Sequence, residues 1–153
     1  MPLKITVRPI RQQDHEEWEA LWRDYNAFYG REGASALPED VIQATWSRLM
    51  SEAGPIHGLV AESERRLVGF AHIIFHPNTI HIEDTCYLQD LFTETECRGR
   101  GVARQLVGAV YEICRSRGVS SVYWHTHASN TAARLLYDKL ATNTGFLVYR
   151  AKA

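Results

Sequence analysis

The sequence predicts one mixed α/β domain, and three observations support this prediction. The chain has 153 residues, of which 45% are hydrophobic, and this suits a single domain with a proper core. Apolar runs of strand period and of helix period follow one another in the order strand, two helices, three strands, helix, strand, helix, strand. No internal repeat, low-complexity tract or linker interrupts residues 1–153. We therefore expect one mixed sheet flanked by about four helices.

The first third of the chain is predicted to form one strand and two helices. Residues 3–8 alternate between apolar and polar side chains, which indicates a strand that Pro9 ends. Asp14 and Glu17 have the spacing of a capping box for the first helix. The apolar residues of this helix recur on one stripe, which is typical of a buried face: Trp18, Leu21, Trp22, Tyr25 and Phe28. Pro38 suits the first position of a second helix.

The middle of the chain is predicted to form three strands. The apolar, β-rich runs 56–61 and 67–75 are joined by the polar residues 63–66, which indicates an antiparallel hairpin. A further strand is expected within 80–93.

The last third alternates helix and strand. A helix follows the glycine-rich loop near residue 100 and is expected to end at Gly118. Residues 119–125 form a short apolar run typical of a strand. Ser129 or Asn130 can cap a last helix, and a final strand is expected over 146–149.

The loop Arg98-Gly-Arg-Gly-Val-Ala103 is the strongest indication of a ligand site. Gly99 and Gly101 lack a Cβ, so the backbone can turn sharply there and bring successive N–H groups close to a ligand. The helix that follows begins with unsatisfied N–H donors and the positive end of its dipole, which favours an anion. Arg98 and Arg100 add positive charge. A phosphate-bearing cofactor is the natural occupant.

Two well-known phosphate loops do not fit this stretch, and a Gly-x-Gly pair alone is more often a simple turn. A Walker loop needs Gly-Lys-Ser/Thr where this chain has Gly101-Val-Ala103. A dinucleotide fingerprint needs a third glycine and an acidic residue about 20 residues further on, near which His125 and His127 stand instead. The Arg-x-x-Gly-x-Ala pattern, within the run from Tyr87 to Leu106, resembles the acyl-CoA pyrophosphate loop of the GCN5-related N-acetyltransferases (GNAT).

This resemblance covers nearly the full length of the chain and implies a single N-acetyltransferase domain with the GNAT fold. That fold is a mixed sheet of six or seven strands, splayed between the fourth and fifth strands, where acetyl-CoA enters. The resemblance implies that loop N–H groups bind the pyrophosphate and that pantetheine lies along the end of the fourth strand. The implied cofactor-binding residues are Leu91, Phe92, Thr93, Arg98, Gly99, Arg100, Gly101, Val102, Ala103 and Asn130. For Asn130, a role as helix cap is an equal alternative, since one side chain could not easily do both.

The same resemblance implies an oxyanion site and a general acid. A backbone N–H near Leu91 or Phe92, freed from the ladder by a β-bulge, would point at the acetyl oxygen. Tyr137 lies seven residues after Asn130, two helical turns on the same face, at the family's usual position for the acid. A phenol of pKa about 10 suits a thiolate leaving group of similar basicity. Outside this motif, packing against the sheet would be the default role of Tyr137.

The general base is left open. The strand Tyr87-Leu-Gln-Asp-Leu-Phe92 is similar to that of the spermidine/spermine and related diamine acetyltransferases, but Gln89 replaces the glutamate that they use for the amine. Gln89 cannot accept a proton, and Asp90 is expected on the opposite face by alternation. A water chain or deprotonation in bulk solvent remains as an alternative. The candidate substrate-binding residues are Tyr25, Tyr29, Gln89, Asp90 and His125.

A second resemblance concerns the end of the chain and bears on the substrate. Four stretches are similar to the yeast Hpa2/Hpa3-like acetyltransferases, which act on histone tails, polyamines or D-amino acids: 125–127, 129–131, 136–139 and 144–146. We expect an acetyl-CoA-dependent N-acetyltransferase that acetylates a primary amine, preferably a small molecule such as a polyamine or amino acid, by direct attack on the thioester. A protein or histone lysine acetyltransferase, or a non-catalytic acyl-CoA sensor, remains as an alternative.

Composition limits partners and location. The formal net charge of −1 and the pI near 6.6 give no general attraction to nucleic acid or to an anionic membrane, and no apolar run reaches membrane-spanning length. Cys86, Cys97 and Cys114 are odd in number, which indicates reduced thiols and a cytoplasmic protein. No third ligand of diagnostic spacing accompanies His125 and His127, so we expect no metal. The chain is too short for the family's seventh strand, which favours a homodimer whose partner completes the sheet edge.

Overall fold

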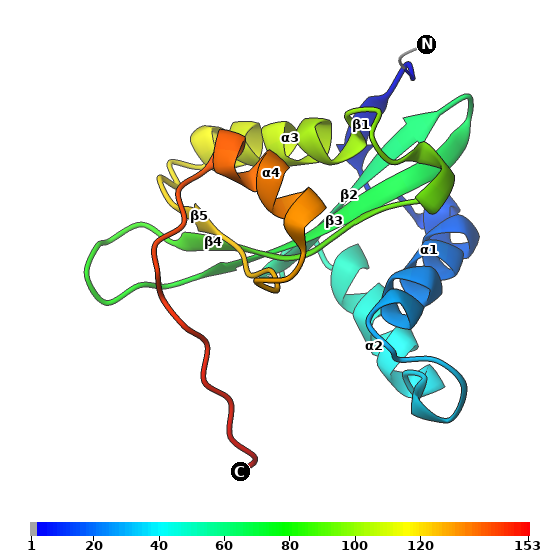
Figure 1. Cartoon of the computed structure of the whole chain (residues 1–153), viewed down its shortest axis with the longest axis horizontal. Helices are drawn as coiled ribbons and strands as arrows, with labels where there is room; N and C mark the ends of the chain where they lie inside the picture. Colours follow the sequence, from blue (N-terminus) through cyan, green and yellow to red (C-terminus); the bar gives the residue numbers. More distant parts are fainter. Residues whose placement is uncertain (1–2) are drawn as a thin grey trace.

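The computed structural model describes residues 3–153 and shows a sheet between two layers of helices (Figure 1). The sheet has five strands in the order β1-β2-β3-β4-β5, with β4 and β5 parallel and the other neighbours antiparallel. The strands are β1 (Thr6–Pro9), β2 (Ile56–Ser63), β3 (Arg66–His76), β4 (Thr85–Thr93) and β5 (Val122–Tyr123). The α-helices are α1 (His15–Phe28), α2 (Glu39–Met50), α3 (Val102–Ser116) and α4 (Thr131–Leu140). The mixed α/β class and the four helices are confirmed.

Each face of the sheet has its own apolar core. On one face, α1 and α2 cover a cluster that includes Trp18, Trp22 and Phe70. On the other face, α3 covers a cluster that includes Leu106 and Val110, both fully buried. The predicted stripe of α1 is therefore confirmed, except that Phe28 at its end is 57% exposed. Burial of these side chains stabilises the domain by roughly 1.5–3 kcal/mol each.

The start of α1 differs from the prediction. Asp14 makes no side-chain cap of α1, so the predicted capping box is wrong. Its carboxylate instead accepts hydrogen bonds from Nη1 and Nη2 of Arg8, each at 2.8 Å, and from the N–H of Arg11 at 2.7 Å. Glu17 accepts a hydrogen bond from the N–H of Leu67 at 2.8 Å, which attaches α1 to β3. Donors outside α1 thus occupy both carboxylates that a capping box would have used.

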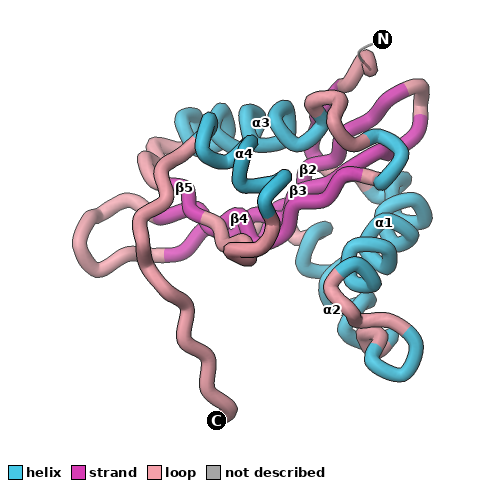
Figure 2. The backbone as a smooth tube through the Cα atoms, viewed as in Figure 1, coloured by secondary structure: helices cyan, strands magenta, loops and turns pink. Residues whose placement is uncertain are grey.

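The sheet opens between β4 and β5. These two strands pair only at Cys86 with Val122 and at Tyr87 with Tyr123. Beyond this point β4 continues along β3 as far as Thr93, whereas the chain after β5 leaves the sheet (Figure 2). The predicted splay between the fourth and fifth strands is therefore present, and it separates two strands that begin side by side.

The predicted final strand over 146–149 is wrong, and the described residues form five strands rather than six or seven. After α4 the chain runs away from the body of the domain to the C-terminus (Figure 1). Phe146 and Tyr149 are each 90% exposed, and Leu147 and Val148 are also exposed. A β-prone segment needs a neighbouring strand to pair with, and this segment extends beyond the sheet of its own chain.

Candidate active site

The glycine-rich loop has the backbone conformation of an anion cradle. Gly99 and Gly101 have φ values of 74° and 87°, which a residue with a Cβ rarely adopts. The N–H of Gln105 donates to the carbonyl of Gly101 at 3.1 Å as the first turn of α3 closes. The N–H groups that precede Gln105 in this turn have no helical acceptor. The loop therefore fits a diphosphate through main-chain donors at the start of a 15-residue helix.

Arg98 does not add its side-chain charge to this cradle. Its Nε donates to the carbonyl of Thr93 at 3.1 Å. Its guanidinium lies over the rings of Phe28 and Phe92, 5.1 and 5.6 Å from their centroids. The side chain thus holds the loop against the end of β4.

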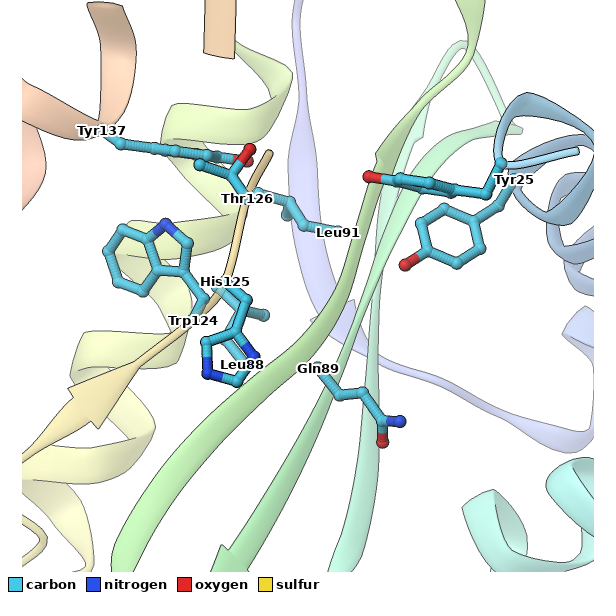
Figure 3. Close-up of a pocket in the computed structure, with 9 residues that line it drawn as sticks. Tyr25, Leu88, Gln89, Leu91, Trp124, His125, Thr126 and Tyr137 are labelled. Carbon is cyan, nitrogen blue, oxygen red and sulfur yellow. The ribbon is translucent and has the colours of Figure 1, made fainter. Parts of the chain in front are cut away.

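A pocket occupies the gap between the splayed strands (Figure 3). Leu88 and Leu91 of β4 form its floor, Trp124 and Thr126 after β5 form one wall, and Tyr137 of α4 closes that side. Tyr25, Tyr29, Gln89 and His125 also line it, so four of the five predicted substrate-binding residues meet there. The structure therefore brings the predicted acid and the predicted acceptor residues to one place.

Tyr137 is positioned by packing. Its ring meets Trp124 edge-on, with the centroids 5.4 Å apart. Burial raises the pKa of Tyr137 above the usual value of 10, so the phenol keeps its proton at neutral pH. Within residues 3–153 its hydroxyl has no hydrogen-bond partner, which leaves the proton available for donation into the pocket.

Asn130 occupies the N-cap position of α4, but its side chain makes no capping hydrogen bond. The alternative role as a helix cap is therefore absent, and the amide is available to a ligand. The end of β4, from Leu91 to Thr93, forms one edge of the splay, where main-chain groups beyond Tyr87 have no β5 partner.

A β-bulge lies in β4, although not where it was predicted. His72 pairs with Asp90 and Ile73 pairs with Leu88, so Gln89 is an extra residue with no partner in β3. The predicted position, near Leu91 or Phe92, is two or three residues too late. Because side chains alternate along a strand, the extra residue reverses the facing of the later residues of β4.

The bulge decides where Asp90 lies. Leu88 and Leu91 both face the α3 core, whereas Asp90 lies on the α1 face with Phe92. Without the extra residue, Leu88 and Asp90 would share one face. Asp90 is therefore on the far side of β4 from Tyr137 and connects to the pocket through Tyr25.

Asp90 belongs to a chain of hydrogen bonds that no pattern in the sequence indicated. Tyr25 donates its hydroxyl hydrogen to Oδ1 of Asp90 at 2.8 Å, and Nδ1 of His72 lies 3.0 Å from Oδ2. Nε1 of Trp18 donates to Nε2 of His72 at 3.0 Å. Trp18 and His72 are buried and are 54 positions apart in sequence, so no local spacing pairs them.

Comparisons with known proteins agree with this geometry. The model of the acetyltransferase (GNAT) family matches residues 16–141. The D-amino-acid N-acetyltransferase HPA3 of Saccharomyces cerevisiae is 32% identical over 149 residues, which cover 96% of this chain and 90% of the yeast protein. The uncharacterized N-acetyltransferase YycN of Bacillus subtilis is 31% identical over an alignment that covers 94% of this chain and 93% of the Bacillus protein. The solved structure of aminoglycoside N-acetyltransferase AAC(6')-Iy in complex with CoA has a TM-score of 0.82 at 19% identity, over 99% of this chain and 97% of that chain.

A sheet splayed between β4 and β5, a left-handed glycine turn at the start of α3 and a half-buried phenol lining the gap are the arrangement expected of an N-acetyltransferase. The chain belongs to the GNAT family of acetyltransferases, whose acyl donor is acetyl-CoA. None of the described helices combines the length and the apolarity needed to cross a bilayer. Within residues 3–153, no three metal-ligating side chains gather at one place.

Proposed function

We propose that this enzyme transfers the acetyl group of acetyl-CoA to the primary amine of a small molecule, with an amino acid or a polyamine as the favoured acceptor. The observation that supports this most is the position of Tyr137, whose unbonded hydroxyl faces the splay pocket opposite β4. The similarity to a yeast enzyme named for D-amino acids makes D-amino acids the first acceptors to test.

The residues of the cradle and the strand edge divide the binding of the donor. The N–H groups from Gly99 to Ala103 would hold the diphosphate, and the unpaired edge from Leu91 to Thr93 would pair with the amides of pantetheine as an added strand does. The side chain of Asn130, which makes no capping hydrogen bond, would also contact pantetheine. When bound, the donor supplies an activated thioester.

The protein itself contributes a hydrogen-bond donor for the oxyanion and a proton for the leaving thiolate. The main-chain N–H of the bulge region, released from the β3 ladder at Gln89, would donate to the oxyanion. Tyr137 would give its proton to the departing thiolate, and its raised pKa keeps the phenol protonated until that thiolate forms.

A thiol-release assay over D- and L-amino acids, polyamines, aminoglycosides and lysine peptides tests this proposal. Turnover with a free amine and none with peptides is the expected result. If lysine peptides are the better acceptors, the enzyme is a protein acetyltransferase. If calorimetry detects acetyl-CoA binding but no amine releases CoA, the sensor alternative holds and the proposal fails.

We also propose that the enzyme is a homodimer in the cytoplasm. The exposed apolar segment from Phe146 to Tyr149 supports a dimer, since a partner that covered these four side chains would remove a contiguous apolar surface from water. Sedimentation of the full chain should give a dimer, and replacing Phe146 and Tyr149 with serine should give a monomer. Three free, buried thiols suit a reducing compartment, which fractionation of the source cells tests.

A further inference from the structure

The hydrogen bonds behind the pocket have only one consistent direction. The indole N–H of Trp18 can only donate, so Nε2 of His72 must accept. The hydrogen of the neutral imidazole is then on Nδ1 and is donated to Oδ2 of Asp90. Asp90 therefore accepts from His72 on one oxygen and from Tyr25 on the other, as a carboxylate does.

This direction fixes what Tyr25 offers to the pocket. Its single hydroxyl hydrogen is used on Asp90, so its oxygen presents only lone pairs to an incoming group. Tyr137 is the opposite case, because its hydroxyl hydrogen has no acceptor within the described chain. The two phenols line the same pocket from opposite sides of β4, one as an acceptor and the other as a donor (Figure 3).

We propose that Tyr25 and Asp90 take the proton of the acceptor ammonium, with His72 and Trp18 as the positioning residues behind them. This inference rests on the proposed acetyl transfer to an amine. One N–H bond of the ammonium breaks as its proton moves to the oxygen of Tyr25. The hydroxyl proton of Tyr25 moves at the same time to Oδ1 of Asp90, and the neutral amine keeps its lone pair for attack. The proton on Asp90 returns through Tyr25 to solvent after the product leaves.

Burial and charge support this path. The side chain of Asp90 is 13% exposed and that of His72 is 4% exposed, so the carboxylate is largely shielded from bulk water and both of its oxygens are held by protein donors. Burial and the neighbouring Asp90 raise the pKa of Tyr25 well above 10, so the phenol does not itself ionise and passes the proton on. Among the described residues that line the pocket, His125 is the other side chain that can take a proton, and its Nδ1 lies 3.3 Å from the hydroxyl of Tyr87.

The decisive experiment compares two acceptors of the same shape that differ in basicity. An alkylamine has a pKa of about 10.4 and is charged at pH 7, whereas its trifluoromethyl analogue is largely neutral. For Tyr25→Phe and Asp90→Asn, kcat/KM with the alkylamine should fall by about 100-fold or more. With the fluorinated amine the fall should be less than about 10-fold, because no proton has to be removed before attack.

Each other outcome has a definite meaning. An equal loss with both amines would show that Tyr25 and Asp90 only shape the site. The proposed proton relay, from the ammonium through Tyr25 to Asp90, would then be wrong. A selective loss in His125→Asn, but not in Tyr25→Phe, would assign the base to His125. If the wild-type enzyme acetylates no amine at all, the proposed function itself fails. If the wild type acetylates amines but the variants lose the same activity with both amines, the relay is refuted and the proposed function stands.

Folding and hydrogen position are checked separately from activity. Tyr111→Phe is the matched control, because its hydroxyl bonds the carbonyl of Leu140 away from the pocket, so it should leave the ratio of the two amine rates unchanged. Variants should bind CoA by calorimetry like the wild type. Nitrogen-15 NMR of the unliganded wild-type enzyme should find the His72 hydrogen on Nδ1. A hydrogen on Nε2 would reverse the chain and overturn the relay.

Discussion

Two glycines of one helix should respond in opposite ways to the same substitution. Gly101, at the start of α3, has φ 87°, and a Cβ added there would meet no atom within 4 Å. The cost of Gly101→Ala is therefore conformational only, about 1–2 kcal/mol. Gly108, inside α3, also has open space around a Cβ but no positive φ, so Gly108→Ala should stabilise the protein by about 1 kcal/mol. The two variants should differ by about 2–3 kcal/mol in unfolding free energy.

Urea unfolding measures that difference, and calorimetry with CoA shows what the left-handed turn does for binding. If alanine at position 101 keeps the turn, the protein loses stability and keeps its CoA affinity. If the turn relaxes, the N–H groups of the cradle reorient and the CoA affinity of Gly101→Ala falls, whereas that of Gly108→Ala stays at the wild-type value. A Gly101→Ala protein as stable as Gly108→Ala, with wild-type CoA affinity, would refute the assignment of the cradle.

Three further predictions concern the general acid Tyr137, the packing of the sheet at Gly69 and the stability of the protein at low pH. Tyr137→Phe should lower kcat by about 100-fold or more without weakening CoA binding in calorimetry, and the raised pKa of Tyr137 means that wild-type activity should not fall through loss of this proton below about pH 10. Gly69→Ala should destabilise the protein by about 3 kcal/mol in urea, because its Cβ would lie 2.6 Å from the carbonyl oxygen of Phe92. Burial alone would raise the pKa of Asp14, but hydrogen bonds from Arg8 and from the Arg11 N–H outweigh it and lower the pKa. The stability that Asp14 adds is therefore present above pH about 3.9 and is lost as the pH falls through the lower pKa of the folded state. The urea midpoints of wild type and Asp14→Asn should therefore converge in acid.

The parts of the fold that the sequence predicted well are those decided by short-range patterns. The stripe of α1 and the stop of α3 at Gly118 follow from spacing and from a glycine with φ 70°. The turn between β2 and β3 follows from a polar break between two apolar runs, and Glu64 and Arg65 adopt positive φ there. The left-handed turn before α3 could likewise be predicted, because Gly99 and Gly101 adopt positive φ without the clash that a Cβ would cause.

The errors arise where a partner outside the helix or strand itself decides the structure. Asp14 fits a helix cap by spacing, yet Arg8 on β1 is its partner. The run from Phe146 to Tyr149 has strand composition, yet a strand exists only where a second strand pairs with it. Local composition states what a segment prefers, and the tertiary environment decides whether that preference is met.

The bulge at Gln89 is a feature that the sequence could not place, and it changes which face of β4 carries Asp90. Strict alternation makes Asp90 a neighbour of Leu88 on the apolar α3 face, where a carboxylate would have no donor. One unpaired residue moves Asp90 to the α1 face, where Tyr25 and His72 satisfy both of its oxygens. Asp90, which the sequence offered as a substrate-binding candidate but not as the base, is thereby linked to the pocket through a phenol. Finding it required knowing where the ladder slips, and that depends on how β3 and β4 pair rather than on either sequence alone.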